Sequence, residues 1–568
     1  MRSFFIPTDI IDYRAFLILA ILICSCETEQ RSADTIILAP TYTMNNEQSW
    51  AEAVVIKDDK IIYVGDKDKA LSYGKNTTKI IKRPDGMVLP GFIDSHVHLL
   101  WGGIEMSECQ LSGLETPEKI LGAIKDYVIS HPDNDWIRGY GWDLTAFPDG
   151  NPRKEWLDDI SPDRPVFLYA YDAHSVWVNS KALSLAGVTS NTSDPENGHI
   201  ERDPITGEPS GVLRENAMEL VKVILPSYDK DEIEDGLKLA MDKANRLGIT
   251  SVFDAGTGPH DGLMHYLKES RNRSTTLRIS ASQYAYPNSW RNDLEKIKKL
   301  RYENEFGFMN TVKIFADGTI EGGSAALNDP YEGTNERGML IWDPDTLNEM
   351  ISEFEKNGFQ IHVHAIGDRG VRTTLDAFEH ASTMNGLGDR RHMISHVQLV
   401  HPNDVSRFKD LNVIASFQAL WAYPDQYMKK LTLPVLGPIR SNWNYPINSI
   451  YSSGGRIVGG SDWTVSSMNP LHAIEVAITR RELGNKDGEV LNPSETVSLE
   501  TILHSYTKEA AFGIFLDDKI GSLEIGKLAD VIILNRNLFE IPKHKIHEVL
   551  VETTIFNGRI IHDNYLLE

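Results

Sequence analysis

The chain has 568 residues, of which 41% are hydrophobic and 24% are charged, and its formal net charge is −24. This balance is typical of a globular protein with one large domain and a smaller companion. The acidic charge argues against binding to nucleic acid or to an anionic membrane surface, because both need a basic face, and we expect a small-molecule substrate.

Residues 1–26 predict a lipoprotein-type signal peptide. An apolar run from Ala15 to Cys24 follows Arg14 and is too short to span a bilayer. Its end, residues 23–26, resembles a bacterial lipoprotein box. We therefore expect Cys26 to carry a lipid that anchors an exported protein to a cell-envelope membrane, on the periplasmic or cell-surface side, as its one membrane contact. An ordinary signal peptide with incidental cysteines is the alternative.

Short alternating strands are predicted near both ends of the chain. They fall within 34–87, for example residues 60–65, and within 517–568, for example residues 529–534. We expect the two ends to pair into one small composite β-sandwich domain.

Eight short apolar runs lie in the middle of the chain, several of them separated by helical stretches, which is the spacing of βα units. They are 88–96, 249–254, 277–285, 311–316, 359–364, 392–396, 412–417 and 456–460. Eight parallel strands close a (β/α)8 TIM-type barrel. The α/β catalytic domain should therefore span 88–516, with an inserted lobe at about 105–245 that has its own strand at 165–170.

The first run ends at His96, and His98 lies two residues later, on the same face of a strand. Both imidazoles can reach one ion at the mouth of a barrel. A His-x-His pair alone is weak evidence, since such residues also occur in cores. The chain has only three cysteines, so any metal must be held by nitrogen and oxygen ligands.

Four further strand ends carry residues of ligand type. These are Lys313, His364, His396 and Asp462. Because the strand ends of such a barrel converge on one site, the combination is stronger than any of its parts.

The motifs PGFIDSHVH, VKIFADG, HVHAIGD, RHMISH and GGSD together resemble those of the amidohydrolase superfamily of metal-dependent hydrolases. More narrowly, they resemble its amidohydrolase-3 or YtcJ-like branch, which includes N-substituted formamide deformylases. The likeness runs from about residue 35 to the C-terminus. It departs from the branch at Ser395, where glutamate is frequent, and at Gln418-Ala419, where Gln-Pro is usual, so the substrate is less certain than the metal set.

The resemblance implies one or two divalent metals, most simply zinc. His96, His98 and Asp462 would bind the first, and His364 and His396 a second or shared ion. Lys313 matches the position that can be carbamylated to bridge two ions; the alternative for Lys313 is an ion pair with Asp317. His362 shares the face of His364 and competes with it for the ligand role.

Metal-activated water would then hydrolyse an amide, a formamide, a cyclic amide or an amino-bearing ring carbon, with Asp462 transferring the proton as catalytic residue. His174 and Trp421 are expected to contact substrate, although His174 is as readily a hydrogen-bonded residue beside Trp177. The alternatives are ester hydrolysis or isomerisation at the same site, or a ligand-binding lipoprotein without catalysis. Oligomerisation stays open.

Overall fold

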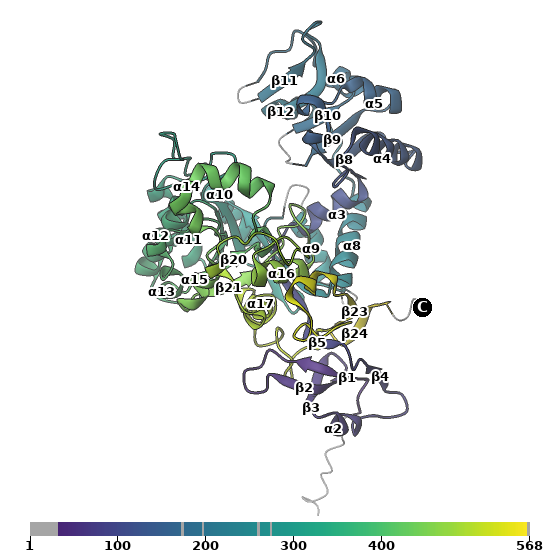
Figure 1. Cartoon of the computed structure of the whole chain (residues 1–568), viewed down its shortest axis with the longest axis vertical. Coiled ribbons are helices and arrows are strands. Elements are labelled where there is room, and N and C mark those ends of the chain that lie inside the picture. The colour runs from purple at the N-terminus through teal and green to yellow at the C-terminus, as the bar shows by residue number, and fades with distance from the viewer. Residues whose placement is uncertain (1–31, 172–174, 196–197, 258–261, 273–274, 565–568) are drawn as a thin grey trace, which may run out of the picture.

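The computed structural model describes residues 32–171, 175–195, 198–257, 262–272 and 275–564, so Cys24, Cys26 and His174 lie outside the described residues. Figure 1 shows three bodies along the long axis of the molecule. The lobe with β8–β12 lies at the top, the barrel in the middle, and the sheet with β1–β5 at the bottom. No helix within the described ranges is long and apolar enough to cross a membrane.

The central body is an α/β barrel of eight parallel strands, and all eight predicted runs contribute to it. In chain order the strands are β6 (Phe92–Val97), β13 (Ile249–Asp254), β14 (Arg278–Tyr284), β17 (Thr311–Phe315), β18 (Gln360–Ala365), β19 (Met393–His396), β20 (Ile414–Phe417) and β21 (Arg456–Gly459). Hydrogen-bonded neighbours run from β21 through to β6. The Asp462 N–H donates to the His96 carbonyl at 2.7 Å, so the chain after the last strand is tied to the first strand.

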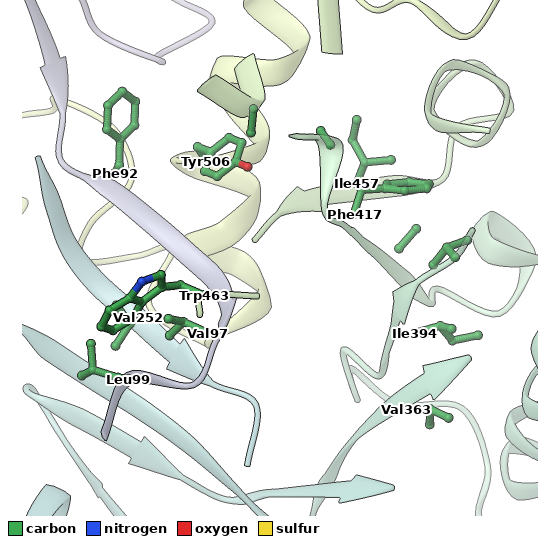
Figure 2. Packing of buried hydrophobic residues seen from close by; sticks show 14 of the residues in the cluster. Phe92, Val97, Leu99, Val252, Val363, Ile394, Phe417, Ile457, Trp463 and Tyr506 are labelled. Carbon is green, nitrogen blue, oxygen red and sulfur yellow. The ribbon is translucent and has the colours of Figure 1, made fainter. Parts of the chain in front are cut away.

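Parallel strands buried on both faces explain the nearly continuous apolar runs. In β18 every residue is buried, yet Ile361 and Val363 belong to the main apolar cluster while the alternate residues are Gln360, His362 and His364. The apolar face packs outward against helices. Figure 2 shows Val363 within this cluster, with Ile394 on the neighbouring strand β19 and Ile457 on β21.

The helices of the barrel follow or precede these strands. They include α3 (Leu99–Ser107), α8 (Lys230–Arg246), α9 (Gly262–Ser270), α10 (Trp290–Lys299), α11 (Pro344–Lys356), α12 (Asp368–Asn385), α13 (Arg407–Asp410), α14 (Leu433–Arg440), α15 (Ile447–Ser452), α16 (Pro470–Thr479), α17 (Leu499–Ser505) and α18 (Lys508–Gly513). A hairpin of β15 (Tyr302–Asn304) and β16 (Gly307–Met309) precedes β17.

Both ends of the described chain meet in one eight-stranded sheet, ordered β24-β23-β22-β5-β1-β2-β3 with β4 beside β1. Its strands are β1 (Thr35–Tyr42), β2 (Trp50–Lys57), β3 (Lys60–Gly65), β4 (Lys79–Lys82), β5 (Met87–Pro90), β22 (Val531–Leu534), β23 (Val551–Phe556) and β24 (Arg559–Asp563); α2 (Lys67–Leu71) follows β3. Val54 of β2 and Ile555 of β23 are far apart in the strand order but share one buried cluster. The sheet therefore folds over itself into a sandwich.

The run expected as one strand at 88–96 is two strands in two domains. β5 pairs with β22 in the sandwich, and β6 pairs with β13 in the barrel. Gly91 lies between them, and a Cβ atom there would come within 2.2 Å of the Thr250 hydroxyl oxygen. At Gly91 two segments of the chain approach closely, and there the run passes from the sandwich sheet to the barrel sheet. An unbroken apolar run in the sequence does not reveal this passage.

The inserted lobe is a six-stranded sheet, ordered β11-β12-β10-β9-β8-β7, with helices beside it. Its elements are β7 (Cys109–Gln110), α4 (Pro117–Ser130), β8 (Ile137–Trp142), α5 (Lys154–Ile160), β9 (Val166–Ala170), β10 (Ser175–Val178), α6 (Ser180–Ala186), β11 (Gly198–Arg202), β12 (Pro209–Glu215) and α7 (Glu219–Lys222). Trp142, Leu168 and Trp177 form part of a core separate from that of the barrel. The strand predicted at 165–170 is β9.

A buried ion pair joins the barrel to the sandwich. Arg278 of β14 donates to the Asp530 carboxylate, and the two side chains are 1% and 4% exposed. The Asp530 carboxylate also accepts the Asn557 N–H at 2.9 Å, and the Arg278 guanidinium lies 4.6 Å from the Phe556 ring centroid.

We expect Arg278→Met to destabilise the protein by about 3–5 kcal/mol, because it leaves the Asp530 carboxylate buried without its cation. Chemical denaturation followed by tryptophan fluorescence would measure the loss. The double variant Arg278→Met/Asp530→Leu should recover most of it, since replacing both charges by apolar groups is often neutral. A single variant as stable as the wild type would contradict this account.

Candidate metal centre

Two histidines and an aspartate meet where the first and last barrel strands end. His96 lies on β6, His98 directly precedes α3, and Asp462 follows β21. Asp462 Oδ1 lies 3.3 Å from His96 Nε2 and 3.2 Å from His98 Nε2. His96 and Asp462 are buried, while the His98 side chain is 26% exposed. One carboxylate oxygen therefore contacts both imidazoles at the C-terminal mouth of the barrel.

His364 of β18 and His396 of β19 lie beside this group. Their ring centroids are 4.5 Å apart, and His396 lies 5.0 Å from His96. One ligand atom from each of His96, His396 and Asp462 can be chosen so that all three lie within 4.8 Å of one another. That spacing allows one ion to contact all three atoms.

The hydrogen bonds of two histidines leave free the nitrogens that a metal would need. His396 Nδ1 donates to Gln418 Oε1 at 2.7 Å, and His364 Nε2 donates to the Gly318 carbonyl at 3.3 Å. Both acceptors are oxygens, so each bonded nitrogen carries the proton. His396 Nε2 and His364 Nδ1 keep their lone pairs, which is how outer partners prepare imidazoles for a metal. The donor set, nitrogen and carboxylate oxygen, fits a divalent ion such as zinc.

Lys313 of β17 is 1% exposed, and its Nζ donates to Ser395 Oγ at 3.3 Å. The alternative ion pair with Asp317 is not formed. The Asp317 carboxylate instead accepts the backbone N–H groups of Ala326, Ile366 and Gly367 at 2.8–3.0 Å. Ser395, one of the departures from the family pattern, thus contacts the predicted ligand Lys313.

Burial sets the charges of the site. It lowers the pKa of His96 to about 4, of His364 to about 3, and of Lys313 to about 7, in each case by disfavouring the charged form. Burial alone would raise the pKa of Asp462, but the His96 and His98 imidazoles hold it well below its usual range. Burial alone would lower the pKa of His98, but the Asp462 carboxylate raises it. Neutral His96 and His364 near an ionised carboxylate are in the protonation state that binds a metal.

His362, the competitor of His364, does not join the atoms around Asp462. Its Nε2 lies 3.0 Å from His96 Nδ1, and its ring stacks on Phe253 at 4.9 Å. His362 therefore contacts the predicted ligand His96 at Nδ1, whereas Asp462 contacts the same ring at Nε2.

The sequence interpretation gave no role to Asp254, which ends β13. Its carboxylate accepts the Leu99 N–H at 3.0 Å and the Tyr266 hydroxyl at 2.5 Å. Asp254 thus fixes the first turn of α3, next to His98. Asp254 ends the second apolar run, and this position could have indicated from the sequence that it lies at the site.

Aromatic rings lie against two of the histidines. Trp421, predicted to contact substrate, stacks on His396 at 5.7 Å with an interplanar angle of 7°. Phe315 lies 5.0 Å from His364, Tyr284 stacks on Phe315 at 6.0 Å, and Tyr286 stacks on Tyr284 at 6.0 Å. Tyr286 is 54% exposed. Through the adjacent imidazoles of His396 and His364, these four rings, Trp421, Phe315, Tyr284 and Tyr286, form a run of ring contacts that reaches solvent at Tyr286. We call these four rings the aromatic wall.

The model of the amidohydrolase family matches residues 85–562. The amidohydrolase YtcJ of Bacillus subtilis (strain 168) is 29% identical over 92% of this chain and 98% of its own length. An N-substituted formamide deformylase of Arthrobacter pascens is 23% identical over 92% and 97%. The crystal structure of an uncharacterized metal-dependent hydrolase from Pyrococcus furiosus superposes with a TM-score of 0.72 and 26% identity, covering 89% of this chain and 99% of that one. The matches confirm the resemblance seen in the motifs.

Proposed function

Since this chain belongs to the amidohydrolase family, we propose that it hydrolyses a non-peptide carbon–nitrogen bond of a small molecule with the help of divalent metal, most simply zinc. The observation that carries the proposal is the convergence of His96, His396 and Asp462, with one ligand atom each within 4.8 Å. His98, His364 and Lys313 would complete the ligand set. The metal supplies a Lewis acid that activates water at neutral pH and polarises a carbonyl.

Asp462 is the group that moves the proton. Its ionised carboxylate can take a proton from the attacking water while the water oxygen bonds to the carbonyl carbon. It then returns that proton to the leaving nitrogen as the carbon–nitrogen bond breaks, giving a carboxylic acid and an amine. The buried surroundings of Asp462 exclude bulk water from this exchange.

The aromatic wall supports an N-acyl or N-formyl amine with an apolar or aromatic substituent. Flat rings such as Trp421 and Tyr284 offer stacking surfaces to such a group. The name of the Arthrobacter pascens relative supports the same class.

The proposal is tested by measuring turnover of N-formyl and N-acyl benzylamines, each beside its benzyl ester analogue. Zinc-loaded protein and chelator-treated protein are compared in each assay. We expect amide cleavage that requires zinc. Cleavage of the esters alone would assign ester hydrolysis to the site. Binding of the amides without turnover of either class would make the protein a ligand-binding module.

We also propose that Lys313 is carbamylated. Among the described residues, Ser395 Oγ is the one hydrogen-bond partner of the buried Lys313 amine, which is poorly matched to a positive charge. Attack of its neutral nitrogen on carbon dioxide, with loss of one proton, would create two anionic oxygens beside the histidines. We expect zinc uptake by the metal-free protein to increase with added bicarbonate, and Lys313→Met to lose this dependence. If zinc uptake by the wild-type protein did not depend on bicarbonate, that result would contradict carbamylation of Lys313.

The lipid anchor is a further prediction from the sequence, at a residue outside the described ranges. We expect Cys26→Ala to abolish lipid attachment and to release the protein from the membrane fraction, because acylation needs the cysteine thiol. Cys24→Ala is the matched control and should keep the protein in that fraction. Metabolic labelling with a fatty acid, followed by fractionation, would measure both. Membrane retention of Cys26→Ala would point to another anchor.

A further inference from the structure

His362 is the fully buried histidine that contacts His96. It lies on β18 with its side chain 0% exposed. Its Nε2 is 3.0 Å from His96 Nδ1, and the ring centroids are 4.9 Å apart at an interplanar angle of 63°. Phe253 stacks on a face of the His362 ring, nearly parallel at 6°. In this packing the ring of His362 directs its Nε2 at His96.

The proton on His96 decides whether that residue can bind a metal. His96 Nε2 faces Asp462, so this nitrogen must be free of hydrogen to act as a ligand. A neutral imidazole then carries its proton on Nδ1. That proton is donated to His362 Nε2, which places the proton of His362 on its own Nδ1.

The reverse arrangement would block the ligand. If His362 carried its proton on Nε2 and donated it to His96 Nδ1, the proton of His96 would move to Nε2, toward Asp462. The other two histidines are bonded to oxygen acceptors, Gln418 Oε1 and the Gly318 carbonyl. Among these three imidazoles, His96 is the one whose partner is another imidazole.

We propose that His362 is a positioning residue that accepts the His96 Nδ1–H and thereby holds His96 in its metal-binding tautomer. This inference rests on the proposed function, since it assumes that His96 is a ligand. Outer partners of metal-bound histidines typically affect metal affinity by about 10–100-fold. His362 itself does not contact the ion or the substrate.

Glutamine and asparagine at position 362 form a matched pair for the test. The amide oxygen of Gln reaches about as far as a histidine Nε2 and accepts a hydrogen bond, whereas that of Asn reaches only about as far as Nδ1. We expect His362→Asn to weaken zinc binding by about 10–100-fold and His362→Gln to stay within about threefold of the wild type. His362→Phe, which keeps the stacking on Phe253 but accepts nothing, should behave like His362→Asn.

Zinc affinity of the metal-free full chain, measured by competition with a chromophoric chelator, gives the result without reference to turnover. Circular dichroism melting of each metal-free variant shows that it is folded. Wild-type affinity in folded His362→Asn and His362→Phe would overturn the inference while leaving the proposed function intact. If folded His362→Gln lost as much zinc affinity as His364→Ala, His362 would itself be a ligand. That result would also overturn the inference. If the wild-type chain itself bound no zinc, the proposed function would fail first, and this inference with it.

Discussion

Asp462→Asn should lower kcat by about 10²–10⁴-fold, the range typical of a lost general base. Asparagine keeps the size of the side chain and one oxygen near His96 and His98, but its amide cannot accept and return a proton at neutral pH. Substrate affinity should change much less, because the loss falls on the transition state. Steady-state kinetics on an N-acyl amine would give kcat and KM separately.

Metal content is the control for this variant, because Asp462 is also a predicted ligand. Zinc per chain, measured by inductively coupled plasma mass spectrometry, should stay near the wild-type value. Asp404→Asn provides a second control, since Asp404 is a buried carboxylate that pairs with Arg372 away from the site and should leave kcat unchanged. A metal-loaded Asp462→Asn enzyme with most of its turnover would assign proton transfer to another group.

His96→Ala should remove both bound zinc and turnover while the chain stays folded. Loss of an outer partner already costs roughly 10–100-fold in affinity, and a direct ligand should cost more. The fold survives because the barrel is held by its apolar cluster and by strand pairing, neither of which depends on this imidazole. Zinc stoichiometry after gel filtration and far-ultraviolet circular dichroism would measure the two outcomes.

His98→Ala should behave in the same way, with a smaller structural effect because His98 is partly exposed. His199→Ala, at an exposed histidine of the lobe that pairs with Asp194, is the matched control and should bind zinc as the wild type does. Full zinc content in a folded His96→Ala protein would remove His96 from the ligand set.

Much of this arrangement follows from local patterns. Each barrel strand is a short apolar run, and the residues at its C-terminal end, such as His396 or Asp462, converge because parallel strands share one direction. The pattern could not separate His362 from His364, because a period of two puts both on the same face. Their roles differ by depth along β18, and only the packing of side chains across the barrel, between β18 and β6, shows which one meets His96.

Other features depend on residues that are distant in the chain. The aromatic wall combines Tyr284 and Phe315 from two strand ends with Trp421 from a short 3-10 helix after β20, and no local sequence signal links them. The change of sheet at Gly91 is similar, because it depends on Thr250. Such contacts arise when the chain has folded, so a single sequence does not reveal them.

The pairing of β5 with β22 bears on how the chain is made. Strand β5 ends at Pro90 and its partner begins at Val531, so nearly the whole protein must be synthesised before that edge of β5 is covered. At typical translation rates this interval is on the order of tens of seconds. During it, an apolar strand edge stays open to mispairing with other chains. We therefore expect nascent chains that stop before β22 to aggregate and to depend on chaperones, even when every barrel strand is already complete.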